Sequence, residues 1–464
     1  MRTEHDMLGT LSIEDDAYYG IHTERAIKNF NITGTPIHAE LVSALVTVKK
    51  AAAITNRDIG ALNKEIADAI ITSCDEILAG ELSDQFVVDS MQGGAGTSAN
   101  MNVNEVIANR AIEKLGGKKG DYSIVHPLDH VNMHQSTNDV FPTAVRIAAI
   151  RLLKPVTEQF AMLQTALQEK EEEFSTVVKV GRTEMQDAVP VTLGQEFGAW
   201  AQAIARDRWR LYKAEERLRQ VGIGGTAVGT GLNAPKEYIF TMIERLRRLT
   251  GIGLARAEFM IDPTQNCDVF VEVSGLLKAA AVSLNKIAND LRLLSSGPLA
   301  GIGEIKLPAV QAGSSIMPGK VNPVICEAMN QVAFQIMADD MAVTLSAQAG
   351  QLELNAFMPL IAKNLLEMLD LLLNMLPLFI ERCISGIEAN IKQCTGKVYG
   401  SYILATALTG YIGYDKAAEV AAICQKTGRT VREVVLKKQL MDEKTLDEIF
   451  RPERLTSPDR FKEK

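Results

Sequence analysis

Residues 312–323 bring together polar groups whose types and spacing could do chemistry. The segment reads AGSSIMPGKVNP, so two serines are followed by a lysine and an asparagine, and a long apolar helix is predicted to start near Pro323. A helix start presents unpaired N–H groups and positive potential, which favour anions. Lys320 adds a point charge and Asn322 a directional donor. The segment is therefore predicted to be a loop that binds an anion and presents a hydroxyl to it.

The distribution of histidine limits how protons can be moved. All six histidines precede position 135. Histidine is the most frequent general acid or base in enzymes. Any proton transfer carried out by the downstream two-thirds of the chain must therefore use another side chain.

A glycine-rich segment at residues 222–227 (GIGGTA) formally matches a dinucleotide-binding fingerprint. That fingerprint requires a strand before the glycines and a helix after them. Residues 209–221 (WRLYKAEERLRQV) instead have the pattern of a charged helix. We therefore expect no nucleotide cofactor.

His126, His130 and His134 follow one another at intervals of four. On a helix this spacing would place three possible metal ligands on one face. Pro127 and the polar residues 132–139 indicate a loop instead, and no thiol or carboxylate cluster completes a site. We expect no metal centre here.

Long amphipathic helices must position these loops. In residues 267–294, apolar side chains recur every three or four positions, which defines one helix face. Strand signals are scarce, and residues 175–180 give the main one. The predicted long helices are residues 41–78, 154–174, 196–221, 267–294, 324–347 and 360–391. The polar, glycine-rich segments between them, where function is expected, are residues 92–104, 132–143, 181–194, 222–233 and 295–323.

The pattern predicts an all-α protein of three domains: residues 1–136, a central bundle of long helices at 137–393, and a small helical unit at 394–464. Shorter helices are predicted in the last unit at 415–425, 430–438 and 442–450. Residues 360–376 are apolar on most sides. We therefore expect that helix at the centre of the bundle and between subunits of a homotetramer.

Composition excludes several classes of protein. The 464 residues are 47% apolar and 23% charged, and this apolar content disfavours disorder. The net charge of −8 disfavours nucleic-acid binding. No window of 18 apolar residues is free of charge, and the first residues (MRTEHDMLG) lack a signal-peptide pattern. Six scattered cysteines without a CxxC pair indicate free thiols. We expect a cytoplasmic protein that does not bind membranes.

Several loops together resemble one known family. GSSIMPGKVNP at residues 313–323 is similar to the signature loop of the aspartase/fumarase superfamily, and the resemblance runs from residues 16–22 (DAYYGIH) to residues 413–418 (GYDKAA). The loops at residues 93–102 (GGAGTSANMN), 135–139 (QSTND) and 181–190 (GRTEMQDAVP) match as well. The resemblance implies the superfamily's three-domain, all-α fold. It also implies a tetramer in which each active site takes its loops from three subunits.

The resemblance also implies a reaction, the reversible β-elimination that gives fumarate. The family's base, which removes a proton next to a carboxylate, corresponds to Ser314. Preorganised donors would stabilise the resulting enediolate, and the corresponding residues are Thr97, Ser136, Thr137 and Ser315. Lys320, Asn322 and Thr183 correspond to the clamp on the other carboxylate. Asn138, together with Thr97, would contact the leaving group.

Position 184 bears on which leaving group is expelled. Residues 93–98 are closer to the aspartase form of that loop than to the fumarase form, and Glu184 stands where relatives carry His or Gln. A carboxylate beside the leaving group favours an ammonium ion, so L-aspartate is the expected substrate. In the family geometry Glu184 would lie near Glu327. Alternatively, Glu184 pairs with a basic residue outside the pocket.

Some positions depart from the family pattern. His134 replaces a small residue, residues 356–359 (AFMP) stand where aspartases tend to have a Val-Met-Glu-Pro type sequence, and Lys363 lies in the following helix. These departures leave open a lyase that expels another amine. The sequence is also compatible with a fumarate hydratase and with a non-catalytic structural homologue.

Overall fold

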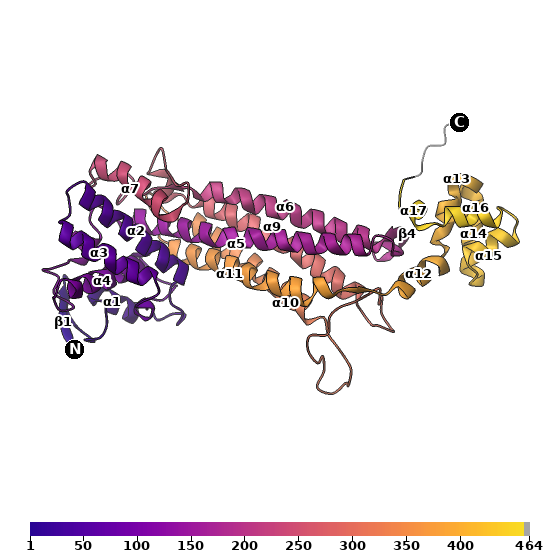
Figure 1. Cartoon of the computed structure of the whole chain (residues 1–464), viewed down its shortest axis with the longest axis horizontal. Coiled ribbons are helices and arrows are strands. Elements are labelled where there is room, and N and C mark those ends of the chain that lie inside the picture. Colours follow the sequence, from indigo (N-terminus) through magenta and orange to yellow (C-terminus); the bar gives the residue numbers. More distant parts are fainter. Residues whose placement is uncertain (459–464) are drawn as a thin grey trace. The chain divides into compact units, whose positions relative to one another are not determined.

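The computed structural model describes residues 1–458, which are predominantly helical. The longest helices are α5 (Thr137–Glu173), α6 (Leu193–Leu218), α9 (Asp268–Leu294), α10 (Val324–Gln348) and α11 (Met358–Arg382) (Figure 1). The strands of the described part form two-stranded sheets only. The predicted all-α fold with a bundle of long helices is confirmed. Among the described residues, no helix is long and apolar enough to cross a membrane.

The chain divides into two compact units, each assembled from three stretches. Unit 1 consists of Met1–Thr157, Trp209–Ala279 and Phe334–Leu373. Unit 2 consists of Glu158–Arg208, Ala280–Ala333 and Asn374–Lys464. Each of the five long helices has one part in each unit. The division of the chain into three consecutive domains stays a prediction.

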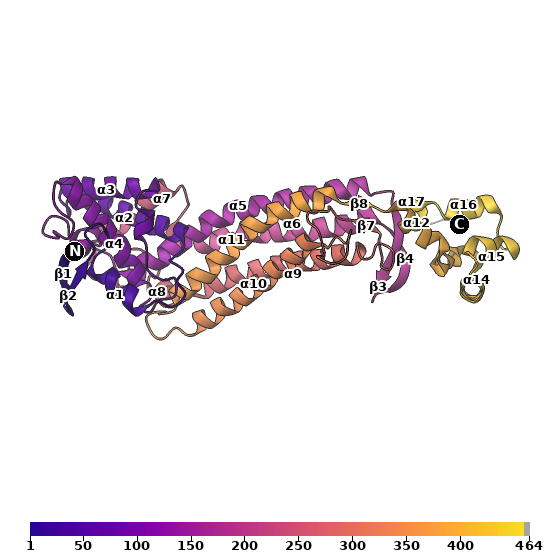
Figure 2. The same ribbon diagram turned by 90° about the horizontal axis from the view of Figure 1, so that it is seen from below.

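The long helices lie side by side within each unit (Figure 2). In unit 1, Arg146 of α5 stacks on the ring of Phe270 in α9 at 4.9 Å. In unit 2, the indole Nε1 of Trp200 in α6 donates to Asp290 Oδ2 in α9 at 3.2 Å, and the Asn330 side chain of α10 also reaches α9. These side-chain contacts link α9 to α5 in unit 1, and to α6 and α10 in unit 2.

The remaining elements of unit 1 are short helices and a hairpin. The single helix predicted at residues 41–78 is wrong, because two helices form there. Gly60 has a φ of +76° and ends the first one, and the Asn63 side chain caps the second by accepting from Glu65 N and Ile66 N. The elements are β1 (Arg2–Asp6), β2 (Gly9–Ile13), α1 (Ile21–Asn29), α2 (Ala39–Asp58), α3 (Lys64–Leu78), α4 (Thr97–Lys114), β5 (Gln220–Val221, which leads out of α6), α7 (Lys236–Thr250), β6 (Ala255–Arg256) and α8 (Asp262–Gln265).

Unit 2 contains the hairpin β3–β4, the strand pair β7–β8 and the C-terminal helices. β3 (Val178–Thr183) confirms the predicted strand at 175–180 with a later start, and it pairs with β4 (Gln186–Thr192). Valines of β3 pack in one core with the C-terminal helices, whose predicted positions are confirmed. The other elements are β7 (Ile305–Lys306), β8 (Glu388–Ala389), α12 (Ile391–Gly400), α13 (Thr409–Ile412), α14 (Tyr414–Thr427), α15 (Val431–Lys437), α16 (Glu443–Ile449) and α17 (Pro452–Leu455).

Several predicted boundaries are wrong. The loop predicted at residues 92–104 ends early, because α4 begins at Thr97, and most of the loop predicted at residues 181–194 lies in strands β3 and β4. Residues 132–143 were expected to form a loop, but α5 begins at Thr137 and includes Pro142. Val140 and Phe141 are buried, and their packing outweighs the hydrogen bond that proline removes. The predicted helix at 360–391 ends at Arg382, ahead of the short strand β8.

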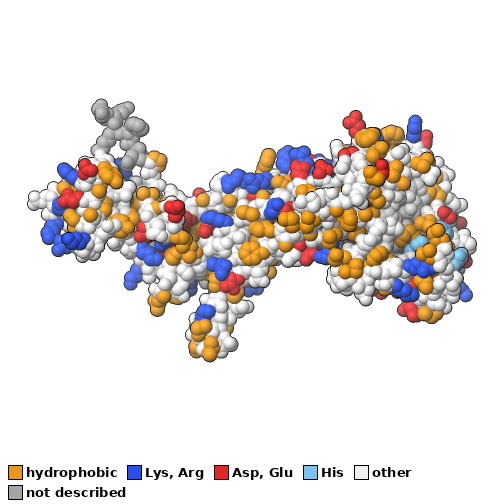
Figure 3. Space-filling view, turned by 180° about the vertical axis from the view of Figure 1, so that it is seen from behind, with side chains coloured by type: hydrophobic (Ala, Val, Ile, Leu, Met, Phe, Trp, Pro, Cys, Tyr) orange, Lys and Arg blue, Asp and Glu red, His pale blue; other side chains and the backbone are white. Residues whose placement is uncertain are grey.

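Helix α11 is apolar on most sides, as predicted, but the single chain already covers it. Leu365, Leu369 and Leu372 are fully buried. Exposed large apolar side chains occur on several elements, and on α10 Phe334 and Met341 are 56% and 59% exposed. Exposed hydrophobic side chains are also visible in the space-filling view (Figure 3). Helix α10 therefore has apolar surface available to a partner, whereas most of the apolar face of α11 is covered within the chain.

All six cysteines are free and buried. Burial raises the pKa of the Cys267 and Cys394 thiols to about 11. These two thiols of the folded chain are thus protonated at neutral pH.

Candidate active site

The predicted site residues of unit 1 lie where helices α4 and α5 begin. Thr97 is the first residue of α4, and Thr137 is the first residue of α5. One turn along α4, the Asn100 side chain donates to Thr137 Oγ1 at 3.1 Å. Gly96 explains the close approach, because a Cβ there would lie 2.5 Å from the ring of Phe141. The structure thus brings the loop before α4 against the start of α5.

A buried polar network supports residues 135–138 on their buried side. The Lys49 ammonium, fully buried on α2, donates to Asn132 Oδ1 at 2.7 Å and to Gln135 Oε1 at 3.0 Å. Asn132 Oδ1 also accepts from Asn100 and Asn104. Burial lowers the pKa of Lys49 to about 7. Helices α2 and α4 and the segment before α5 are therefore linked through a single asparagine oxygen.

Asp139 fixes the same segment from within α5. One of its carboxylate oxygens accepts from Ser136 N, and the other accepts from Gly224 N and Thr226 N, all at 3.0 Å. Burial raises the pKa of Asp139 to about 6, although these N–H groups and Lys49 lower it. The backbone of residues 222–227, which resembled a dinucleotide fingerprint, therefore surrounds a carboxylate of the chain itself.

Asn138 is tied to the same glycine-rich loop. Its Nδ2 donates to Ala227 O at 2.8 Å, and its backbone N donates to Ser136 Oγ at 3.2 Å. The Oδ1 atom of Asn138 accepts no hydrogen bond within residues 1–458. Asn138 therefore offers an acceptor to a ligand.

His134 adopts a left-handed backbone conformation with a φ of +61°. Its Nδ1 lies 2.8 Å from Asn56 Oδ1, and its ring meets the Tyr238 ring edge-on at 5.3 Å. Burial lowers the pKa of His134. His126 and His130 lie at a short π-helical turn, Pro127–Val131, where His126 N donates to His130 Nδ1. Across residues 1–458, no three His, Cys, Asp or Glu side chains form a group that could hold a metal.

In unit 2, residues 312–323 form the predicted loop before α10. Ser314 Oγ accepts from Ile316 N at 3.2 Å and from Met317 N at 2.9 Å. Asn322 Nδ2 donates to Gly313 O at 2.8 Å, which closes the loop on itself. Ser315 and Lys320 are exposed. The loop thus presents a hydroxyl that carries two backbone donors.

The hairpin β3–β4 carries the other two predicted residues of unit 2 at its tip. Thr183 ends β3 and Glu184 begins the turn, and both are exposed. Glu184 makes no hydrogen bond or ion pair among residues 1–458, so the alternative pairing with a basic residue is not seen in that part. Glu327, in the first turn of α10, is half-buried.

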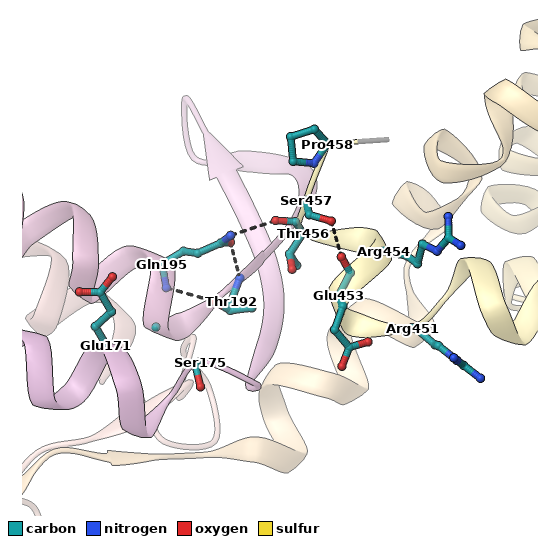
Figure 4. A pocket seen from close by; sticks show the side chains of 11 residues that line it. Glu171, Ser175, Thr192, Gln195, Arg451, Glu453, Arg454, Thr456, Ser457 and Pro458 are labelled. Carbon is teal, nitrogen blue, oxygen red and sulfur yellow. Dashed lines mark hydrogen bonds between the residues drawn. The ribbon is translucent and has the colours of Figure 1, made fainter. Parts of the chain in front are cut away.

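Two cavities of unit 2 differ in their relation to these residues. A cavity of about 430 Å³ is lined by Glu184 together with Lys179, Glu196 and Trp200. A cavity of about 800 Å³ lies between the start of α6 and α17 and is lined by polar side chains such as Gln195 (Figure 4). The second cavity contains none of the predicted site residues.

Sequence comparison identifies the family. The profile of a lyase family matches residues 9–338, and that of the fumarase C C-terminus matches residues 404–457. The chain belongs to the aspartase/fumarase family of lyases. It is an enzyme, and its curated relatives place it among the carbon–nitrogen lyases.

Individual members of the family are similar over nearly their whole length. An aspartate ammonia-lyase from a Bacillus species is 48% identical over 458 residues, which cover 99% of this chain and 98% of the relative. The aspartate ammonia-lyase of Escherichia coli K12 is 47% identical, and the match covers 99% of this chain and 96% of that protein.

Solved structures confirm the lyase fold. A Brucella melitensis protein described as fumarate lyase:delta crystallin, solved with bound cobalt, superposes with a TM-score of 0.96 at 49% identity and covers 98% of this chain and all of that one. A class II fumarase from Schistosoma mansoni gives 0.93 at 35% identity, with 97% and 98% coverage.

Two buried residues of this lyase were missed by sequence reasoning. Lys49 and Asp139 support the predicted residues without having been singled out. Lys49 offered a signal, because it is a charged residue inside the apolar run of residues 41–54. Of the departures from the family pattern, Lys363 pairs with Glu367 on its own helix at 2.7 Å, and Phe357 is partly exposed before α11.

Proposed function

We propose that this chain is an aspartate ammonia-lyase, which eliminates ammonia from L-aspartate reversibly to give fumarate. The observation that carries the proposal is the near-full-length similarity, 48% over 99% of the chain, to enzymes of that name. The complete set of polar residues in the family's loops supports it. No cofactor is assigned.

Ser314 is proposed as the base. A serine hydroxyl accepts a proton from carbon only as an alkoxide, so its oxygen must be stabilised. The two backbone N–H groups that donate to Ser314 Oγ supply such stabilisation. The electron pair of the C–H bond moves into the neighbouring carboxylate to form an enediolate. It then forms the double bond as the C–N bond breaks and ammonia leaves.

The other residues are proposed to divide into three sets. Thr97, Ser136, Thr137 and Ser315 donate to the enediolate. Lys320, Asn322 and Thr183 hold the second carboxylate, for which Asn322 must exchange its contact with Gly313 O. Glu184 and the Oδ1 of Asn138 face the ammonium group, while Glu327 and His134 support the site.

We also propose a cytoplasmic homotetramer whose active sites are shared among three subunits. Exposed apolar residues on α10, such as Phe334 and Met341, offer a surface for assembly. Analytical ultracentrifugation at micromolar concentration tests this. A tetramer is expected, and a monomer would contradict it.

An ammonia-release assay over a panel of amino acids tests the proposed activity. Release from L-aspartate and an ammonia-dependent loss of fumarate absorbance are expected. Water-dependent loss of fumarate without ammonia would identify a fumarate hydratase, an alternative favoured by the similarity to a class II fumarase. Release from a different amino acid would identify another amine lyase, consistent with Glu184, His134 and residues 356–359. No turnover of any substrate would indicate a structural homologue.

A further inference from the structure

Glu304 is a fully buried carboxylate outside the set of proposed substrate contacts. Its side chain has no exposed surface, and three cations surround it. Arg182 binds both oxygens, at 2.5 and 3.0 Å. Lys179 Nζ lies 3.2 Å from Oε2, and Lys397 Nζ lies 3.6 Å from Oε1. Because burying charges is costly even when they are paired, such a cluster points to a required geometry rather than to stability.

Two of these cations come from strand β3, the strand that leads to Thr183 and Glu184. Residues three apart on a regular strand face opposite sides, yet Lys179 and Arg182 reach the same carboxylate. The pairing register of β3 and β4 shifts between Val180 and Arg182, and such a shift increases the local twist. Gly181 permits it, because a Cβ there would lie 2.6 Å from Val189 O.

Among residues 1–458, no side chain of the hairpin tip beyond Arg182 anchors the tip to the rest of the chain. Thr183 and Glu184 are exposed and form no side-chain hydrogen bond or ion pair in that part. Glu184 and Met185 have φ values of +53° and +64°, which hairpin turns normally assign to Gly, Asn or Asp. The turn is therefore intrinsically unfavourable for its residues, and Arg182 is the last anchored side chain before it.

The backbone of Glu304 is itself fixed on both sides. Glu304 N donates to Leu294 O, and Glu304 O accepts from Asn390 N at 2.8 Å. The next two residues form β7, which pairs with β8. The carboxylate is thus a fixed point against which an exposed hairpin tip can be held.

We propose that Glu304 is a positioning residue, which acts through Arg182 to hold the hairpin tip, so that Glu184 faces the ammonium group of the substrate and Thr183 faces its carboxylate. The inference rests on the proposed function for the roles of these two tip residues. It adds the buried residue that keeps Thr183 and Glu184 in one position. Arg182 is the link, and Lys397 and Lys179, which also pairs with Glu196, are further cations near the same carboxylate.

Substitution of the two cations gives a matched test. Arg182→Gln removes the link to the hairpin, whereas Lys397→Gln removes a cation from the same carboxylate that belongs to α12 and not to the hairpin. Arg182→Lys keeps the charge and loses the two-point contact, so an intermediate effect is expected. Glu304→Gln should reproduce Arg182→Gln if it folds, and the arginine variants decide the matter if it does not.

The first readout compares aspartate with succinate, which lacks the amine. Arg182→Gln should raise KM for aspartate about tenfold and the inhibition constant of succinate by about threefold or less. Lys397→Gln should leave both within about twofold. Equal shifts for both ligands, or the same pattern in Lys397→Gln, would overturn the proposal, because a purely structural role predicts them.

The second readout needs no substrate. Amide hydrogen exchange of residues 183–187 should be about tenfold faster in Arg182→Gln than in the unaltered enzyme, and unchanged in Lys397→Gln. Unchanged exchange at the tip in Arg182→Gln would refute the positioning role. If the unaltered enzyme releases no ammonia from aspartate, the proposed function fails, and the exchange measurement still decides whether Glu304 and Arg182 hold the tip.

Discussion

The segment at residues 135–138 and the loop at residues 312–323 carry comparable polar side chains but are held in opposite ways. In the first, buried partners such as Lys49 and Asp139, some from distant parts of the sequence, fix the backbone from behind. In the second, the bonds of Ser314 and Asn322 stay within the loop, and most of its residues are exposed.

The difference separates two ways of placing a catalytic group. Donors that must be preorganised before charge develops gain from a rigid, buried support. A hydroxyl that must meet the substrate gains from a short turn that carries its own donors. Substitutions in the loop should therefore change activity without changing stability, and substitutions behind residues 135–138 should change both.

Ser314→Ala gives the largest expected effect. Loss of the proposed base should lower kcat by about 10⁴-fold, the upper end for a general base, while the melting temperature stays within about 1 °C because Ser314 contacts only its own loop. Ammonia release and differential scanning calorimetry measure the two quantities. Near-normal turnover would require another base. A large fall in melting temperature would contradict the view that the loop at residues 312–323 contributes little to stability.

Lys320→Ala should have the next largest effect. It removes a charged partner of the substrate carboxylate, so kcat/KM for aspartate should fall by about a hundredfold, with KM and kcat both affected. Lys278→Ala is the matched control, because it removes a surface-reaching lysine that pairs with Asp340 instead. A change in kcat alone would show that Lys320 does not bind the ground state.

Glu184→Gln tests the proposed contact with the ammonium group. Loss of a partly screened attraction should cost about 1–3 kcal/mol, or about ten- to a hundredfold in kcat/KM for aspartate, because the charge is removed and the shape is kept. Binding of succinate should change little or improve. Equal weakening of succinate and aspartate would make Glu184 structural and would weaken the argument for an amine leaving group.

The buried support should be visible in the pH dependence of stability. The pKa of Lys49 is about 7 in the folded chain, against 10.5 for a lysine side chain exposed to water. Between pH 7 and pH 10.5 the unfolded chain therefore binds up to one more proton than the folded chain. Unfolding free energy should therefore rise with pH above 7, by up to about 1.4 kcal/mol per unit. The raised pKa of Asp139, about 6, acts in the opposite sense between pH 3.8 and 6.

Urea unfolding of Lys49→Met at pH 7, 8 and 9 isolates this contribution. The variant should be less stable overall, because Asn132 and Gln135 lose their donor, and its pH slope should be smaller. An identical slope in the unaltered protein and the variant would show that Lys49 is not the group that titrates.

The helices and loops of this lyase follow local signals, so most could be predicted. Periodic apolar residues located α9 and α10 within one or two positions, and the loop before α10 was found from Ser314, Lys320 and Asn322 alone. The exceptions are instructive. Packing of Val140 and Phe141 extended α5 backward past Pro142, and a single left-handed glycine at position 60 divided one predicted helix into two.

The pairings of the supporting residues could not be predicted, because the partners are far apart in the sequence. Lys49 meets Asn132 across 83 positions, and Arg182 meets Glu304 across 122. Neither pairing leaves a local pattern. The loops proposed to touch substrate have recognisable compositions, whereas the charges that hold them are isolated residues in otherwise ordinary segments.

The burial of all six thiols has a practical consequence for handling the protein. Alkylating reagents attack thiolates, and the folded chain presents no exposed thiol and, at Cys267 and Cys394, no lowered thiol pKa. A maleimide therefore adds mass only to molecules in which unfolding has exposed a thiol. A brief pulse of reagent followed by mass spectrometry would report the unfolded fraction of a preparation, or of a lysate, without purification and without a substrate.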